Sequence, residues 1–469
     1  MMLVSEIISP VIKQCLARVV NQSRFKRLLT SPHIPCRRCP QRKLHSNSKE
    51  QVPQAWQESF HLEPPQLDLQ YLCNPQNTEQ IHQNIVNRKG VGDIHKVVSL
   101  WQEYNKATEA DYKKEIWKQL IAAAKDIPNT SHPTSPIGDE DQARVVSLVG
   151  TKREFDFKPK TVVELGDKLG LLRTDNVSMT TGERTYYLKD ELARLEQALI
   201  QYTVDRVKQK GFQLVTVPDM IHPAVIESCG FKTSGERTQV YKLDPSKHGD
   251  VCLAGTSEMP LAGYFMNEEL QLDQLPVKLS SISRCYRAET SELQEEKGIY
   301  RVHQFTKVEL FGVSCSKGGG ESDRLLEELL DLQKNLFADL GLHFRVLDMP
   351  THELGAPAYR KYDIEAWMPG KQFWGEISSS SSCTDYQSRR LHIKYRGQDG
   401  HLKHVHTVNG TACAVPRMIM AIMENNQNKD GSVSLPEVLW PYMNTEVITK
   451  SHSNVQPHWI RLKKIKSKK

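Results

Sequence analysis

The sequence lacks the features that would place the chain in a membrane or build a zinc site. Of its 469 residues, 38% are hydrophobic and 25% are charged, and no run approaches the roughly 18–20 apolar residues of a membrane span. Its ten cysteines include one C-x-x-C pair, Cys36 and Cys39, without the second pair that a tetrahedral site needs. We therefore expect a soluble protein of two or three domains, no membrane partner and no zinc. Five scattered cysteines are expected to be buried thiols: Cys229, Cys252, Cys285, Cys383 and Cys413.

Acidic residues are almost absent from the first 43 positions. Nine lysines and arginines accompany the single acid Glu6, together with serines, leucines and the run "RRCPQRKLHS". This composition is typical of a mitochondrial presequence, which we expect to end near Leu44, and a basic tail is the alternative. The other end, "WIRLKKIKSKK", is also basic and is either a solvated tail or a phosphate-binding one.

Glycine and proline are absent between Asp93 and Ile127. The pattern there is helical, and Thr108 with Asp111 resembles a capping box, so we predict two helices that separate near Lys106. A loop-rich linker follows. From Ala143 onward, helical and strand patterns alternate in the sequence. The helical patterns lie at 188–210, 325–341 and 416–427, and the β-branched runs lie at 212–220, 276–286 and 299–313.

The stretch "RCYRAETSELQEEKGIYRVHQFTKVELF" predicts a long antiparallel hairpin with a polar loop of about nine residues. Arg287 and Glu289 are two apart and would share a face of an extended chain. After Gly298, polar and apolar positions alternate again. One face of the hairpin would then carry Arg301, His303, Phe305, Lys307 and Glu309.

Three other polar clusters interrupt the core pattern. Thr256 and Glu258 precede an apolar helix, Glu376 stands beside a run of five serines, and Arg417 lies in the first turn of a helix, a favourable place for an anionic phosphate. The hairpin and two of these clusters have structural alternatives: an ion pair between Arg287 and Glu289, a loop for the serines, and a helix cap for Thr256 and Glu258. Together they supply arginines for phosphates and carboxylates for a cation and an amine. No G-K-[ST] phosphate loop is present.

These motifs resemble those of a known family. The hairpin with Arg287 and Glu289 resembles motif 2 of class II aminoacyl-tRNA synthetases, "AVPRMIMAIMENNQ" is similar to their motif 3, and "GFQLVTVPDMI" resembles the dimer-forming motif 1. The runs "GTSE", "YRVHQFTKVE", "YDIEAWMPG" and "DYQSRRL" resemble those of seryl-tRNA synthetases. "LAGYF", "LGLHFRVLDMP" and "TACAVPR" are similar to the animal mitochondrial members. The resemblance runs from about Ile127 to Tyr442.

The resemblance implies an α+β fold, an antiparallel sheet flanked by helices and preceded by a small N-terminal α-helical hairpin domain. The expected division is a presequence at 1–44, a helical tRNA-binding domain at 45–126, the catalytic domain at 127–445 and a basic tail at 446–469. It also implies a homodimer in the mitochondrial matrix whose partners are serine, ATP and mitochondrial tRNA(Ser).

The implied reaction joins serine to ATP as seryl-adenylate and then transfers the seryl group to tRNA. By the resemblance, Arg287 holds the α-phosphate, Arg417 grips the γ-phosphate, and Glu289 contacts the adenine side. Glu376 ligates Mg²⁺ with help from Ser379, since hard oxygen ligands suit that ion. The other residues expected to bind ATP are Ala288, Val302, His303, Gln304, Phe305 (as the stacking ring), Ile377 and Ser378.

Serine is small, so apolar packing discriminates by only about 1–3 kcal/mol per methylene, and rejecting alanine needs groups that remain unpaired without the substrate hydroxyl. The positions that match the family's serine contacts are Thr256, Ser257, Glu258, Glu309 and Thr411. Glu258 suits the ammonium, and Glu309 and Thr411 suit the hydroxyl. The structural alternative for Glu309 is a salt bridge to Lys307 or Arg301.

Three departures from the family pattern stand out. Ser382 replaces the usual Asn, and Val162 replaces a usual histidine. The third is the arm: 92–126 holds only two helices of about 15–17 residues, or ~25 Å each, where the family has a long coiled coil. Binding of tRNA would then depend on 46–72 and 461–469. A non-catalytic synthetase-like subunit is the alternative function.

Overall fold

A large antiparallel sheet forms the centre of the computed structural model, which describes residues 62–174, 180–235, 238–289, 298–318 and 320–451. The expected presequence, the Cys36–Cys39 pair and the basic end from 452 onward lie outside the described residues. The sheet has eight strands in the order β1-β10-β11-β12-β15-β9-β8-β4, and every neighbouring pair is antiparallel except β4 and β8. Its strands are β1 (Arg144–Val149), β4 (Gln213–Leu214), β8 (Val277–Tyr286), β9 (Gln304–Ser314), β10 (Phe344–Asp348), β11 (Arg360–Met368), β12 (Phe373–Thr384) and β15 (His406–Ala414).

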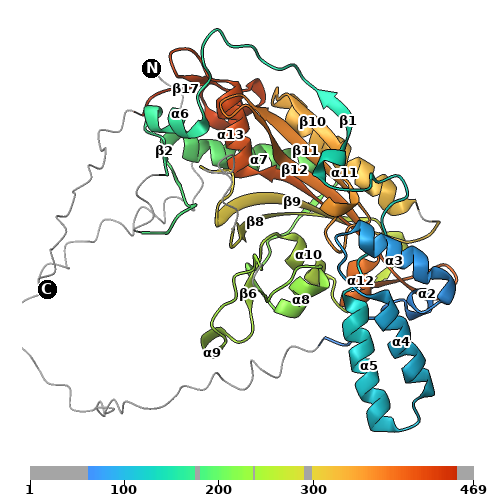
Figure 1. Cartoon of the computed structure of the whole chain (residues 1–469). Helices are drawn as coiled ribbons and strands as arrows, with labels where there is room; N and C mark the ends of the chain where they lie inside the picture. The colour runs from blue at the N-terminus through green and yellow to red at the C-terminus, as the bar shows by residue number, and fades with distance from the viewer. Residues whose placement is uncertain (1–61, 175–179, 236–237, 290–297, 319, 452–469) are drawn as a thin grey trace, which may run out of the picture. The chain divides into compact units, whose positions relative to one another are not determined.

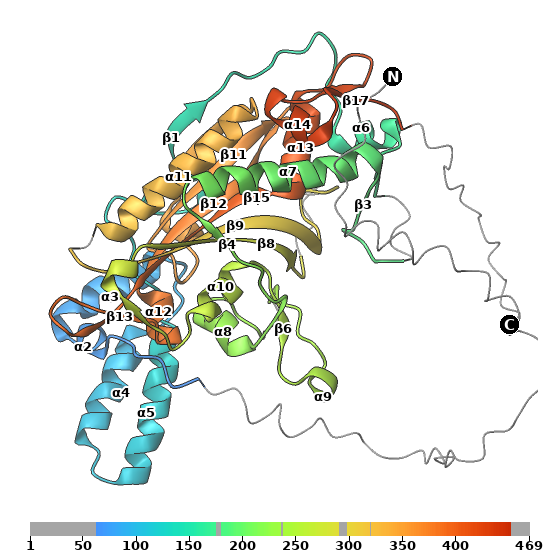
Figure 2. The ribbon, with the colours of Figure 1, turned by 180° about the vertical axis from the view of Figure 1, so that it is seen from behind.

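Three long helices cover one face of this sheet (Figures 1 and 2): α7 (Asp190–Gln209), α11 (Glu321–Asp339) and α13 (Val415–Asn425). The alternation of β9 explains the packing, because Val308 and Leu310 point into the core beneath these helices. Phe311 and Val313 point to the other face, where they pack with α8 (Pro223–Ser228) and α10 (Glu258–Tyr264). Residues at odd positions of β9 therefore face away from the three helices.

The helical segment before the sheet consists of α2 (Leu69–Leu72), α3 (Thr78–Asn87), α4 (Ile94–Lys106) and α5 (Ala110–Lys125). The predicted separation near Lys106 is confirmed. The capping box is wrong, because Glu109 is the N-cap residue of α5 and its side chain makes no capping hydrogen bond. The two hairpin helices have 13 and 16 residues, about 20 and 24 Å at 1.5 Å per residue.

The remaining helices and strands are short. The helices are α6 (Val162–Leu169), α9 (Pro245–His248), α12 (Tyr386–Leu391) and α14 (Trp440–Met443). The strands are β2 (Leu172–Arg173), β3 (Tyr187–Leu188), β5 (Met220–Ile221), β6 (Cys252–Leu253), β7 (Glu269–Gln271), β13 (Lys394–Arg396), β14 (Leu402–His404), β16 (Val433–Ser434) and β17 (Val447–Ile448). None of the helices in the described part of the chain combines the length and hydrophobicity of a membrane span.

Several sequence expectations change in the structure. The predicted hairpin exists as β8 and β9, but β9 begins at Gln304 because 298–301 form turns and a bend, so Arg301 and His303 lie before the strand. The run at 212–220 forms only β4 and the first residue of β5. The five serines lie within β12 and not in a loop. All five cysteines expected to be buried thiols are free and buried.

Candidate active site

A polar cavity of about 380 Å³ opens on the sheet face that the three long helices leave free. Its lining comes from the β8–β9 hairpin, the segment 353–358, β11, β12, β15 and the first turns of α10 and α13, among others, so segments far apart in the sequence converge on one space. Thirteen residues predicted from the sequence line it: Thr256, Glu258, Arg287, Glu289, Val302, Phe305, Glu309, Glu376, Ile377, Ser378, Ser379, Thr411 and Arg417.

One end of the cavity is organised around Arg417 in the first turn of α13. Its Nη1 donates to the Oε2 of Glu376 at 3.0 Å and to the Glu376 carbonyl at 2.9 Å, and its guanidinium lies 4.3 Å from the centre of the Tyr300 ring. Burial alone would raise the pKa of Glu376, but the charges of Arg417 and Lys361 outweigh it and hold that pKa at about 2. This end therefore carries an ionised carboxylate beside a fixed cation.

Arg287 follows the last residue of β8 and is held in two ways. Its Nε donates to the Gly255 carbonyl at 3.2 Å, and its guanidinium lies 5.3 Å from the centre of the Phe305 ring. Oε2 of Glu289 lies 3.5 Å from Nη1 of Arg301, and no ion pair joins Glu289 to Arg287 in the described part of the chain. The ion pair considered between Arg287 and Glu289 is thus replaced by one across the hairpin.

The other end of the cavity contains two buried carboxylates. Glu258 is 7% exposed and Glu309 is 2% exposed. Glu309 Oε2 lies 2.5 Å from Nζ of Lys307 and accepts a hydrogen bond from the Thr411 hydroxyl at 3.2 Å. The salt bridge considered between Glu309 and Lys307 therefore exists, and it coexists with the contact to Thr411.

The charge states at this end are set by burial. Burial, together with the neighbouring Glu309 carboxylate, raises the pKa of Glu258 to about 7. Burial also raises the pKa of Glu309, against the opposing charge of Lys307. Glu258 Oε1 accepts hydrogen bonds from Nε2 of Gln387 at 2.7 Å and from Nδ2 of Asn409 at 3.0 Å, so the carboxylate is held in one orientation.

Sequence reasoning did not assign a role to three residues at this end. Lys307 joins Glu309 to Thr256, whose hydroxyl accepts from Nζ at 2.8 Å. The signal for Lys307 was available, because Phe305, Lys307 and Glu309 share one face of a strand. Gln387 and Asn409, which hold Glu258, lie on α12 and β15, and no local pattern connects them with Glu258.

Four predicted residues do not line the cavity. The backbone N–H of Ala288 donates to the Gln239 carbonyl, and Gln304 is exposed at the start of β9. Nδ1 of His303 lies 2.8 Å from the Tyr241 hydroxyl and 2.9 Å from the Arg287 carbonyl. Ser257 is fully buried, and its hydroxyl has no hydrogen-bond partner among the described residues.

Ser378, Ser379 and Ser381 of the serine run in β12 line the cavity. The Ser378 hydroxyl donates to the Thr411 carbonyl at 2.6 Å, and the Ser379 carbonyl accepts from Gln333. Ser382, at the position where the family usually has Asn, is fully buried, and its hydroxyl has no hydrogen-bond partner in the part of the chain that the structure describes. Within the described residues, no group of three or more His, Cys, Asp or Glu side chains is placed to hold a metal ion.

The antiparallel sheet, with arginines and carboxylates at a cavity on one face, is that of a class II aminoacyl-tRNA synthetase. The family model for the "tRNA synthetase class II core domain (G, H, P, S and T)" matches residues 241–426. The seryl-tRNA synthetase of Pyrococcus horikoshii, solved in complex with ATP, superposes with a TM-score of 0.75 at 30% identity. That match covers 82% of this chain and all of the other.

Relatives of similar sequence narrow the class to one family. The chain is 44% identical to the serine–tRNA ligase of Treponema denticola over 70% of its own length and 77% of that protein's. It is 50% identical to the mitochondrial serine–tRNA ligase of Mus musculus over 71% of its own length, and spans 64% of that protein's. The chain belongs to the seryl-tRNA synthetase family.

Proposed function

We propose that this chain is a mitochondrial serine–tRNA ligase. The observation that carries the proposal is the division of one cavity into two ends, with Arg417 beside ionised Glu376 at one and buried Glu258 beside Glu309 and Thr411 at the other. The first end suits a triphosphate, and the second suits a small molecule with an ammonium and a hydroxyl.

The proposed first step joins serine and ATP. A serine carboxylate oxygen attacks the α-phosphorus, the bond to the β-phosphate bridging oxygen breaks, and pyrophosphate leaves. Arg287, held by the Gly255 carbonyl and the Phe305 ring, stabilises the charge that develops on the α-phosphate oxygens. Arg417 binds the γ-phosphate, and Glu289 contacts the adenine side. Because the protein forms no covalent bond, its contribution is orientation and charge neutralisation.

The proposed binding of serine uses the buried end. Glu258, oriented by Gln387 and Asn409, accepts from the serine ammonium. The Thr411 hydroxyl and the Glu309 carboxylate pair with the serine hydroxyl. Alanine would form neither of these hydrogen bonds, and Thr411 and Glu309 would keep only their bond to each other and the ion pair with Lys307. A pocket built to hydrogen-bond a substrate hydroxyl rejects the smaller analogue in this way.

A magnesium ion fits this site as a companion of ATP. Glu376 is ionised and 37% exposed, and the neighbouring Ser379 lines the same cavity. Mg²⁺ commonly takes one or two carboxylates with substrate phosphates and water, so a single carboxylate is sufficient. When bound, the ion would neutralise phosphate charge.

In the second step the terminal ribose hydroxyl of tRNA attacks the seryl carbonyl, and AMP leaves. We assign tRNA binding to residues 45–126 and to the basic tail 446–469, catalysis to 127–445, and import to 1–44. Removal of a segment ending near Leu44 would be checked by N-terminal sequencing of the protein from isolated mitochondria, and an intact Met1 would contradict it.

We also propose a symmetric homodimer formed through the region around Pro218. Sedimentation of the mature chain at micromolar concentration tests it, and a monomer would contradict it. Serine-dependent ATP–pyrophosphate exchange is the central test of function. Exchange activity would distinguish the ligase from a non-catalytic synthetase-like subunit. No observation on this chain favours that alternative.

A further inference from the structure

One arginine of the helical segment reaches the wall of the cavity. Arg88 follows α3 and is 5% exposed. Its Nη1 donates to the carbonyls of Ala358 at 2.8 Å and Asn129 at 3.1 Å, and its Nη2 donates to the carbonyl of Gly355 at 2.5 Å. Gly355, Pro357 and Ala358 line the cavity. One guanidinium therefore ties three carbonyls of two connecting segments together.

Arg88 is an unusual buried cation. Among the described residues no carboxylate lies within ion-pair distance of it, and its partners are backbone carbonyls and the Ser131 hydroxyl. Burial lowers the pKa of Arg88 to about 10, which leaves the side chain charged near neutral pH. Burying a charge is costly unless hydrogen bonds replace those made to water. Moving these carbonyls would remove the hydrogen bonds of a buried cation, so Arg88 holds them in place.

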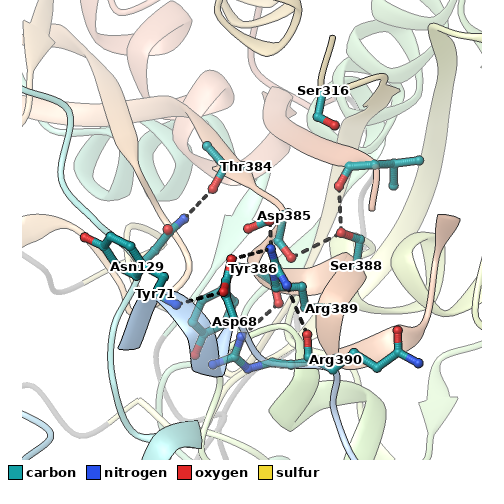
Figure 3. A network of polar contacts seen from close by, with 12 residues as sticks. Asp68, Tyr71, Asn129, Ser316, Thr384, Asp385, Tyr386, Ser388, Arg389 and Arg390 are labelled. Atoms are coloured by element: carbon teal, nitrogen blue, oxygen red, sulfur yellow. Dashed lines mark hydrogen bonds and ion pairs between the residues drawn. The ribbon is translucent and has the colours of Figure 1, made fainter. Parts of the chain in front are cut away.

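Asn129 also holds the segment 355–358, which we call the wall of the cavity. Its Nδ2 donates to the Pro357 carbonyl at 2.8 Å, and to the Cys383 carbonyl and the Thr384 hydroxyl at 2.9 Å each. Figure 3 shows this side chain reaching Thr384 at the end of β12. On the far side, Pro357 packs so closely on Gly230 that an added Cβ there would lie 2.5 Å from its Cδ.

This wall lies at the end of the cavity where Glu258 is held. Asn409, which donates to Glu258, also donates to the sulfur of Cys383, and the Cys383 carbonyl accepts from Asn129. Arg417 and Glu376 belong to the opposite end. A change in the wall is therefore expected to weaken binding of the substrate group that faces Glu258 and to leave binding of the triphosphate unchanged.

We propose that Arg88, which belongs to the helical segment, acts together with Asn129 as a positioning residue. The two side chains fix the segment 355–358, which forms part of the serine end of the cavity. The inference rests on the proposed function, because it names serine as the molecule bound there. It makes the helical segment part of the architecture of the active site, in addition to its proposed role in binding tRNA.

The test compares Arg88→Lys with Leu100→Ala. Lysine keeps the charge but lacks the planar fork with which the guanidinium holds carbonyls through both of its Nη atoms. Leu100 is buried in the core cluster of the helical segment, which contains none of the residues 355–358. In pyrophosphate exchange we expect Arg88→Lys to raise the KM for serine about tenfold, with the KM for ATP changed less than about twofold. Leu100→Ala is expected to leave both KM values unchanged.

Hydrogen exchange provides a readout that does not depend on activity. The Ala358 amide donates to the Gly355 carbonyl and the Tyr359 amide to the Ser382 carbonyl, so both are protected by the wall's own geometry. Faster exchange of these amides in Arg88→Lys, but not in Leu100→Ala, is expected. If Arg88→Lys does not fold, Asn129→Ser is used, and it should shift the serine KM in the same direction.

The outcomes separate the two proposals. Absence of exchange activity in the unmodified chain would overturn the proposed function, while the amide measurement would still test the role of Arg88. An unchanged serine KM in Arg88→Lys, or an equal rise in Leu100→Ala, would overturn the positioning role.

Discussion

The cavity and the helical hairpin are built on opposite principles. The cavity depends on buried charge, because Glu258, Lys307 and Glu309 lie almost entirely out of water and are stable only with their partners. The hairpin of α4 and α5 depends on a small apolar seam, in which Ile94 and Leu120 are fully buried, with charged residues left to solvent. We therefore expect that adenylate formation in the cavity and tRNA binding by the hairpin can be lost independently of each other. The following predictions test that separation.

The largest effect is expected for Arg287→Ala. Loss of a donor to the developing phosphate charge costs about 3–4 kcal/mol of transition-state stabilisation, so pyrophosphate exchange should fall by about 10²–10³. Arg284→Ala is the matched control, because this exposed arginine lies three residues away and does not line the cavity. Equal losses in both variants would contradict the role of Arg287.

The effect of a variant on discrimination against alanine should be the next largest. A site that hydrogen-bonds a substrate hydroxyl rejects the analogue without it by about 10⁴–10⁵ in kcat/KM. Exchange measured with serine and with alanine gives this ratio directly, and we expect Thr411→Val to reduce it at least about tenfold, because the valine cannot pair with the hydroxyl. If alanine supports exchange as well as serine, the roles of Glu309 and Thr411 are wrong.

The pH dependence of serine binding should follow Glu258. Its pKa, raised to about 7 by burial and by Glu309, means that the carboxylate is ionised above pH 7 and increasingly protonated below it. Because the protonated form cannot balance the serine ammonium, the KM for serine should rise as pH falls from 8 to 6. The KM for ATP should show no matching rise, since Glu376 stays ionised throughout this range.

The Glu258→Gln variant is the control for this profile. Glutamine keeps an oxygen for Gln387 and Asn409 but has no charge to lose. Its KM for serine should be higher at all pH values and nearly flat between pH 6 and 8. A slope equal to that of the unmodified chain would assign the titration to another group.

The smallest effects concern the hairpin. A hairpin of about 20–24 Å cannot span what a long coiled coil spans, so we expect tRNA charging to depend on electrostatic contacts made by 46–72 and 461–469. We expect serylation to be weak, to fall steeply with salt, and to fall a further few-fold when Arg461 to Lys469 are deleted. Pyrophosphate exchange should change little in the same preparations.

Charging that ignores both the salt concentration and the tail deletion would show that the short hairpin is sufficient for tRNA binding. A parallel loss of exchange would instead show that the hairpin and the cavity do not function separately. The role proposed for Arg88 sharpens this test, since it predicts a contact between the helical segment and the serine end that does not depend on tRNA.

Much of the molecule follows from local patterns in the sequence. The helices at α4, α5, α7 and α11 are encoded by apolar spacing and by glycine or its absence, which act over a few residues. Motif order identified the class and the family, and thirteen of the seventeen residues predicted for the site line one cavity. Position-by-position alternation also placed Glu309 on the correct face of its strand.

The tertiary structure alone decided which distant groups meet. Nothing near Glu258 in the sequence indicates Gln387 or Asn409, and nothing near Gly355 indicates Arg88, which lies 267 positions earlier. The pairing of Glu289 with Arg301 and not with Arg287 likewise depends on where each strand ends. The physical reason is that periodicity reports which side of an element is buried, whereas a buried polar group is stable only beside its partner, and that partner is brought to it by the fold.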